Sequence, residues 1–137
     1  MIDILVIDDE PSVGDALSIV LGDQGYRVVV AHNGRDAIEL AKSERFSVAI
    51  TDLRLPDMSG FDVLHYLKMN DPNFPIIVIT AHCTPEVVAE SKRLGALEVL
   101  SKPFFPSDIL SLINAGLKRE ITCEMEIAED SRAEPLP

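Results

Sequence analysis

The chain has 137 residues, which is enough for one domain with a hydrophobic core and too few for two ordinary ones. Hydrophobic residues make up 47% of it, so we expect a folded globular protein. Its net charge of -11 disfavours attraction to phosphate backbones and anionic lipid surfaces, so direct nucleic-acid binding is not expected. The apolar runs are far shorter than the roughly 20 residues that span a bilayer, and no leader-like segment opens the chain; these features predict a cytoplasmic protein without a membrane span.

Short apolar runs alternate with helical patterns along the chain. Residues 4–7 are apolar on both faces, which is typical of a central parallel strand. Pro11 suits the first turn of a helix, whose apolar pattern ends at Gly25. Further strands are predicted over residues 28–31, 48–50, 76–79 and 97–100, and a helix follows each of them, with Gly95 closing the fourth helix and Ser107 opening the last.

Five strands that alternate with five helices predict an α/β domain with a parallel sheet, because each crossover returns the chain right-handedly to the sheet. Beyond Glu120 the composition changes, with five acids, one base and two prolines between residues 124 and 137. The expected domain therefore covers residues 1–120. Residues 121–137 are expected to form an acidic helical extension or a disordered tail.

Polar residues follow four of the predicted strands. Asp8 and Asp9 follow the first strand, Asp52 the third, Thr80 the fourth and Lys102 the fifth. In open α/β sheets the ligand crevice lies outside the carboxyl ends of the strands, at the point where the strand order reverses. We therefore expect these five side chains to meet in one pocket.

Three carboxylates in one pocket repel one another, which raises a pKa or is relieved by a cation. Mg²⁺ fits such a pocket because it prefers oxygen ligands and is typically held by one or two carboxylates plus a phosphate. Beside the metal, Lys102 could neutralise phosphoryl oxygens, Thr80 could donate to one of them, and Asp52 could attack phosphorus in line. The product would be an acyl phosphate that water can hydrolyse.

Each of these residues also has an ordinary structural interpretation. Asp52 alone could be a turn residue or a helix cap, and Asp8 and Asp9 could cap the first helix. Thr80 could be a strand-end hydroxyl and Lys102 a surface charge. Their joint placement at four strand ends favours the functional interpretation.

The chain resembles the receiver domain of bacterial two-component response regulators over roughly residues 2–120. The resemblance rests on four segments in the family's order and spacing: IDDEP, TDLRLPDMSG, ITA and GALEVLSKPF. It implies a flavodoxin-like (βα)5 fold with strand order 2-1-3-4-5. It also implies that a sensor histidine kinase or a phosphotransfer protein supplies the phosphoryl group.

The resemblance also implies a metal-binding role for several residues. Asp52 would be the phosphoacceptor and would ligate Mg²⁺ directly, together with Asp9 and the backbone carbonyl of Arg54. Asp8 would act through water.

Other positions receive catalytic, modulating or structural roles from the same resemblance. Lys102 would pair with the phosphoryl group, and the bond from Lys102 to Pro103 is usually cis in the family. Arg54 and His82 occupy positions that modulate hydrolysis of the acyl phosphate. Pro56 and Gly60 are expected to be structural.

One position departs from the family pattern. Receiver domains usually carry Tyr or Phe three residues before the pocket lysine, and this aromatic ring turns inward on activation; here the residue is Val99. Valine is stiff at χ1 and has no ring to reorient. We therefore expect the loop over residues 80–85 and the helix after it to carry the response.

The function expected from these features is a phosphorylation-controlled switch that catalyses its own phosphorylation and dephosphorylation and has no external substrate. A receiver-like interaction module that never needs phosphate is one alternative. A Mg²⁺-dependent phosphatase of the haloacid-dehalogenase type is another, but that family places its nucleophile after the first strand in a D-x-D arrangement. Here the first strand is followed by Asp8-Asp9-Glu10.

The partners expected from the resemblance are the kinase and either a downstream protein or a fused output domain. The sequence leaves open whether the chain acts alone or as the receiver part of a longer regulator. It also does not identify the kinase, the pathway or the oligomeric state. A homodimer, if formed, would use the fourth helix, the fifth strand and the fifth helix.

Overall fold

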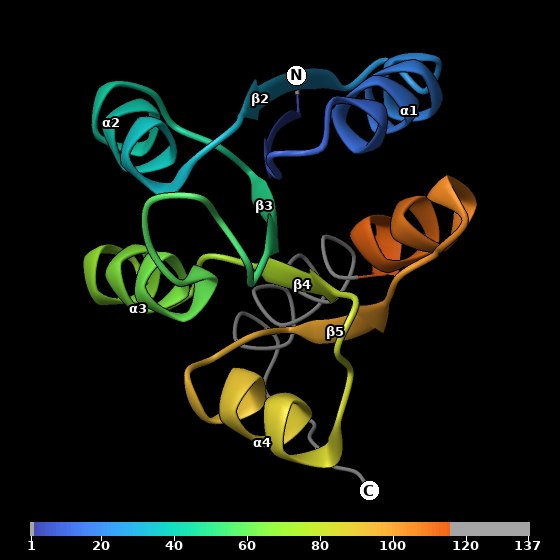
Figure 1. The fold of residues 1–137 in the computed structure, drawn as a ribbon. Helices are drawn as coiled ribbons and strands as arrows, with labels where there is room; N and C mark the ends of the chain where they lie inside the picture. Colours follow the sequence, from blue (N-terminus) through green and yellow to red (C-terminus); the bar gives the residue numbers. More distant parts are fainter. Residues whose placement is uncertain (1, 116–137) are drawn as a thin grey trace, which may run out of the picture.

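A five-stranded parallel sheet lies between two layers of helices in the computed structural model, which describes residues 2–115 (Figure 1). The elements are β1 (Asp3–Ile7), α1 (Pro11–Gly22), β2 (Arg27–Ala31), α2 (Gly34–Ser43), β3 (Val48–Asp52), α3 (Gly60–Asn70), β4 (Ile76–Thr80), α4 (Pro85–Arg93), β5 (Glu98–Ser101) and a final helix over residues 106–115. The predicted tail over residues 121–137 lies outside the described residues.

The strands lie in the order β2-β1-β3-β4-β5, and all four pairings are parallel. The predicted order 2-1-3-4-5 and the flavodoxin-like fold class are therefore confirmed. In this order the chain moves outward from β1 in both directions, so the strand order reverses between β1 and β3. Their carboxyl ends form the switch point at which open α/β sheets bind ligands.

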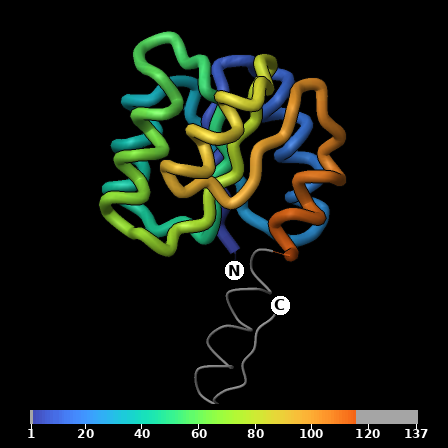
Figure 2. Tube along the Cα trace, turned by 90° about the horizontal axis from the view of Figure 1, so that it is seen from below, coloured from blue at the N-terminus to red at the C-terminus, as the bar shows by residue number. Residues whose placement is uncertain are grey.

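Each face of the sheet has its own hydrophobic core. In β1, Leu5 and Ile7 pack with residues of α2 and α3, whereas Ile4 and Val6 pack with residues of α1 and the helix over 106–115. All four side chains are fully buried, as the continuous apolar run predicted for a central strand. Figure 2 shows α2 and α3 on one side of the strands and α1 and the final helix on the other.

Local signals in the sequence account for the helix boundaries. Asn33, Ser59 and Thr84 begin α2, α3 and α4, and the side chain of each accepts a hydrogen bond from a backbone N–H of the first turn. Gly25 and Gly95, where the helical patterns were predicted to end, have φ values of +87° and +105°. Because glycine reaches this region at little cost, both residues allow the chain to reverse after a helix.

The strands extend further toward the site than the sequence predicted. β3 includes Asp52 and β4 includes Thr80, although the apolar runs end one or two residues earlier. The reason is that ladder pairing continues past the apolar run, with Asp52 opposite Ile79 and Thr80 opposite Ser101. The predicted start of β5 was early by one residue and that of the final helix late by one. Within residues 2–115, no helix is both long enough and apolar enough to cross a membrane.

Candidate functional site

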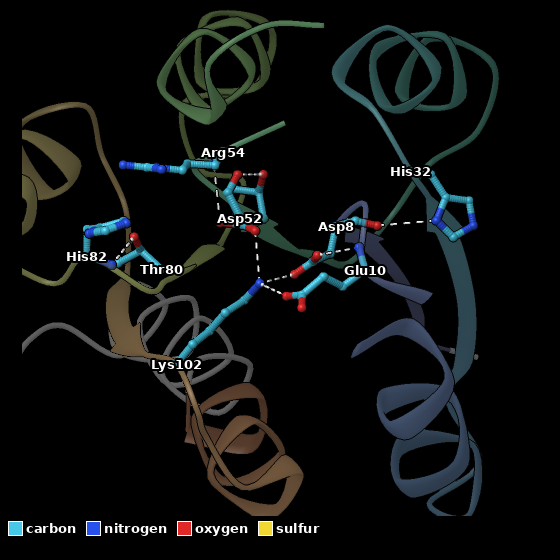
Figure 3. Close-up of polar contacts among 9 residues, drawn as sticks. Asp8, Glu10, His32, Asp52, Arg54, Thr80, His82 and Lys102 are labelled. Atoms are coloured by element: carbon cyan, nitrogen blue, oxygen red, sulfur yellow. Dashed lines mark hydrogen bonds and ion pairs between the residues drawn. The ribbon is translucent and has the colours of Figure 1, made fainter. Parts of the chain in front are cut away.

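The carboxyl ends of four strands bring together Asp8, Asp52, Thr80 and Lys102, four of the five polar residues that the sequence singled out (Figure 3). Asp8 follows β1, Asp52 ends β3, Thr80 ends β4 and Lys102 follows β5. The side chains of Asp8, Asp52 and Lys102 are in direct contact. The predicted convergence at the switch point is therefore present for these residues.

Asp52 is held in place from two sides. Only 5% of the residue is exposed. Its Oδ1 atom accepts a hydrogen bond from the backbone N–H of Arg54 (3.2 Å), and its Oδ2 atom accepts one from Nζ of Lys102 (2.9 Å). The carboxylate is thus oriented by the loop after β3 and by the cation after β5.

Lys102 connects three carboxylates. Its Nζ atom lies 2.7 Å from Oε1 of Glu10 and 2.9 Å from both Oδ2 of Asp8 and Oδ2 of Asp52. Burial by itself disfavours the ammonium, but the contacts with these three carboxylates outweigh burial and raise the pKa of Lys102. Lys102 is therefore a permanent positive charge at the centre of the site.

Asp8 is the most buried of the three acids, with no exposed surface. Its Oδ1 atom accepts the backbone N–H of Glu10 (2.9 Å). Its Oδ2 atom lies in the ion pair with Lys102 but accepts no hydrogen bond from any described residue. Burial raises the pKa of Asp8, although the amide of Glu10 and the ammonium of Lys102 both oppose this effect. A buried carboxylate oxygen without a hydrogen bond is a suitable ligand for a cation.

Carboxylate oxygens of Asp8, Glu10 and Asp52 all lie within 4.8 Å of one another. This donor set consists only of hard oxygen ligands, which Mg²⁺ prefers. Together with the Oδ2 atom of Asp8, which accepts no hydrogen bond from a described residue, it fits a divalent cation. The structure places Asp9 differently, as an exposed residue outside this group.

Glu10 is the site residue that sequence reasoning missed. It precedes Pro11, the first residue of α1, and its carboxylate reaches across to Lys102, which lies 92 residues further along the chain. The hydrogen bond from Lys102 lowers the pKa of Glu10. The one available signal was its place in the acidic triplet after β1, but nothing local shows which of the three adjacent acids contact Lys102.

Thr80 lies at the edge of the site and is 2% exposed. Its Oγ1 atom accepts a hydrogen bond from the backbone N–H of His82 (3.1 Å), and its carbonyl oxygen accepts the N–H of Lys102 (2.8 Å). The side chain of His82 is exposed. The hydroxyl of Thr80 thus keeps its own proton for donation to a ligand, because its only described contact uses it as an acceptor.

The loop after Asp52 is tightly closed. Gly60 donates its N–H to the carbonyl of Leu53 (2.8 Å), and a Cβ atom on Gly60 would lie 2.2 Å from the carbonyl oxygen of Asp52. Only glycine fits there, so the predicted structural role of Gly60 has a clear physical basis. Pro56 is exposed in the same loop, and the side chain of Arg54 is exposed beside the site.

Two residues of the β5 region were also singled out in the sequence. The peptide bond between Lys102 and Pro103 is cis, as the resemblance implied. Val99 pairs with Val78 of β4 and is half-buried, and its side chain packs against the core that α2 and α3 cover. It contributes to packing beneath α4 and lies outside the carboxylate group.

Fold and site together define a doubly wound α/β domain with one acidic crevice, in which a lysine contacts a nearly buried aspartate. Residues 4–114 match the family model for the response regulator receiver domain, and the chain belongs to this family. Members of the family are phosphoacceptor switches rather than conventional enzymes. They bind Mg²⁺ through an acidic cluster and interact with kinases and output domains. The interaction-module and phosphatase alternatives are not favoured by this match.

Several known proteins are similar to the chain. Sporulation initiation phosphotransferase F of Bacillus subtilis is 35% identical over 114 residues, which cover 83% of this chain and 92% of that protein. The probable transcriptional regulatory protein TcrX of Mycobacterium tuberculosis is 34% identical over 85% of this chain, which spans 50% of TcrX. A CheY-like receiver domain from Methanospirillum hungatei has a TM-score of 0.85 at 28% identity, covering 89% of this chain and 98% of that one.

Proposed function

We propose that Asp52 is the phosphoacceptor of this receiver domain. The observation that supports this most directly is the contact between its Oδ2 atom and Nζ of Lys102 in an otherwise acidic crevice. In the reaction, a carboxylate oxygen of Asp52 would attack phosphorus in line, and the bond from phosphorus to the donor's leaving group would break. The product on Asp52 would be an acyl phosphate.

The neighbouring residues would stabilise the charge that is transferred. Lys102 would exchange a contact with a carboxylate for one with a phosphoryl oxygen, because its ammonium is already within 2.9 Å of Asp52. Thr80 would donate its hydroxyl proton to a second phosphoryl oxygen. Hydrolysis of the acyl phosphate by water would return the domain to its starting state, with Arg54 and His82 modulating access of that water.

Mg²⁺ would supply a fixed positive charge that neutralises carboxylate and phosphoryl oxygens. Asp8, Glu10 and Asp52 would hold it according to the contacts in the structure. The family resemblance suggests a different set, with Asp9, Asp52 and the Arg54 carbonyl as direct ligands and Asp8 acting through water. Comparing Mg²⁺ affinity in Asp9→Asn and Glu10→Gln distinguishes the two sets, because only the true ligand should weaken binding markedly.

The deciding experiment is incubation with Mg²⁺ and acetyl phosphate, followed by measurement of intact mass. The wild type should gain one phosphoryl group and Asp52→Asn should gain none. A wild-type protein that gains no mass would count against the switch. A gain that persists in Asp52→Asn would place the acceptor elsewhere.

The response is proposed to pass through the loop over residues 80–85 and through α4. Thr80 begins this loop and Val99 offers no aromatic ring to reorient. Structures with and without a phosphoryl mimic test this idea. Backbone that stays unchanged in the loop, with rearrangement only around Val99, would contradict it.

The proposed setting is a cytoplasmic two-component pathway. A sensor histidine kinase or phosphotransfer protein would supply the phosphoryl group, and a downstream protein or fused output domain would read the switched surface. The proposed domain covers residues 1–120. A homodimer through α4, β5 and the last helix is one form that this surface could take.

A further inference from the structure

Asp57 lies at the tip of the loop that joins Asp52 to α3, and its carboxylate contacts the start of another helix. Its Oδ1 atom accepts the backbone N–H of Gly34 (2.8 Å), and its Oδ2 atom accepts that of Arg35 (2.9 Å). Gly34 and Arg35 are the first two residues of α2. Asn33 already caps α2 by accepting the N–H of Asp36. The free N–H groups at this helix end are therefore shared between a local cap and a residue of a distant loop.

The carboxylate of Asp57 is ionised in this arrangement. The hydrogen bond from Gly34, followed by that from Arg35, lowers the pKa of Asp57. Negative charge is also favoured at a helix N-terminus because the peptide dipoles point their positive ends there.

The neighbouring residue, Met58, provides a second contact between the same two elements. A Cβ atom on Gly34 would lie 2.4 Å from Cγ and 2.6 Å from Sδ of Met58. The side chain of Met58 thus occupies space that exists because Gly34 has no side chain. The tip of the loop therefore contacts the start of α2 in two ways, through the hydrogen bonds of Asp57 and the packing of Met58.

The base of the loop is joined to the phosphoacceptor. Arg54 and Ser59 form an isolated bridge across it, and the N–H of Arg54 donates to Oδ1 of Asp52. The loop between these points is short and closed, so few backbone bonds separate its tip from the Arg54 amide. The amide that contacts Asp52 therefore belongs to the same short loop whose tip contacts α2.

We propose that Asp57 is a positioning residue for phosphoryl transfer: its contacts with Gly34 and Arg35 hold the loop so that the Arg54 backbone faces Asp52. This inference rests on the proposed role of Asp52. Asp57 does not contact the reacting atoms and would act through Arg54. Accurate placement matters because small displacements of a reacting group slow a reaction strongly.

The test compares Asp57→Ala and Asp57→Asn with Asp62→Asn, a control that removes one exposed carboxylate from the first turn of α3. The maximal rate constant of phosphorylation by acetyl phosphate should fall about tenfold in Asp57→Ala and about threefold in Asp57→Asn. The half-saturating concentration should change little, and the control should stay within about twofold of wild type. The NMR signal of the Arg54 amide should shift in both Asp57 variants.

An Asp57→Asn protein that phosphorylates at the wild-type maximal rate, with an unshifted Arg54 amide, would overturn the proposal and leave Asp57 as a helix cap only. If Asp57→Ala does not fold, Asp57→Asn decides, because it keeps one acceptor oxygen. If the wild type takes up no phosphate, the proposed function of Asp52 fails. In that case the NMR shift of the Arg54 amide in Asp57→Asn still tests whether Asp57 positions the Arg54 backbone.

Discussion

The two ends of the parallel sheet differ in what fills them. At the carboxyl end, Asp8, Asp52 and Thr80 are buried next to Lys102, and one carboxylate oxygen accepts no hydrogen bond from a described residue. At the amino end lies a cleft of about 680 Å³, between the ends of α2 and α3, lined by Ala41, Lys42, Ser43, Glu44, Arg45, Phe46, Tyr66, Leu67, Asn70, Asp71 and Phe74.

The hollow and the buried charge therefore lie at opposite ends of the sheet. The amino-end cleft combines aromatic side chains with polar groups such as Asn70, whose Nδ2 atom already donates to the carbonyl of Tyr66 (2.9 Å). At the carboxyl end, the buried Oδ2 atom of Asp8 accepts no hydrogen bond from a described residue. Burying such a charged oxygen costs free energy unless a ligand binds to it. Substitutions at the two ends should therefore have different consequences.

The largest effect should come from the cation at the carboxyl end. Lys102→Ala should slow phosphorylation by acetyl phosphate at least about 100-fold, because one preorganised charge-stabilising donor is typically worth that much. Lys92→Ala removes an exposed cation from α4 and should change the rate less than about twofold. Rates followed by intact mass check both variants. A loss below about tenfold for Lys102→Ala would mean that the lysine is mainly a counterion for Asp8.

A pair of glycines offers the next test. Gly60→Ala should lower the free energy of unfolding by about 3 kcal/mol, because the new Cβ atom would meet the backbone of Asp52 and Leu53, which cannot move aside. Gly22 ends α1 at the opposite end of the sheet, and nothing lies within 4 Å of an added Cβ there. Gly22→Ala should stabilise the protein slightly, by roughly 0.5 kcal/mol. Urea denaturation measures the free energy of unfolding of both variants. Equal changes in the two variants would contradict the conclusion that Gly60 is crowded and Gly22 is not.

Asp8→Asn should make the protein more stable at neutral pH, because it removes a charge that burial disfavours while Lys102 keeps Glu10 and Asp52 as partners. The pKa of Asp8 is raised in the folded state above its value of 3.8 in the unfolded chain, so the folded state favours the protonated form. Its charge therefore costs stability above the folded pKa, and this cost disappears as pH falls through the folded pKa toward 3.8. Unfolding curves of the two proteins should converge at low pH. A constant difference at all pH values would point to packing rather than charge.

The smallest effect should come from the amino-end cleft. Asn70→Ala removes a polar group from its lining and should change the phosphorylation rate less than about twofold, since the substitution lies at the opposite end of the sheet. Intact-mass kinetics check this. A marked change in rate would show that the two ends of the sheet are coupled and would contradict the expectation that they act independently.

Much of the site could be predicted because the relevant signals are local or simply ordered along the chain. The apolar runs determined the strands and their alternation with helices, and in such a fold every strand's carboxyl end lies on the same side. Asp8, Asp9, Asp52, Thr80 and Lys102 were therefore expected to lie on one side of the sheet, and of these only Asp9 lies outside the group. The strand ends were less accurate, because the ladder continues one or two residues beyond the apolar run into Asp52 and Thr80.

Only the tertiary structure decided which side chains meet. The sequence shows three adjacent acids after β1, but in the fold Asp8 and Glu10 contact Lys102, whereas Asp9 lies outside the carboxylate group. The contact of Asp57 with Gly34 joins residues 23 positions apart and has no local signal at all. The physical reason is that periodicity and capping act within a few residues, whereas the direction of a side chain across a crevice depends on how separate elements pack.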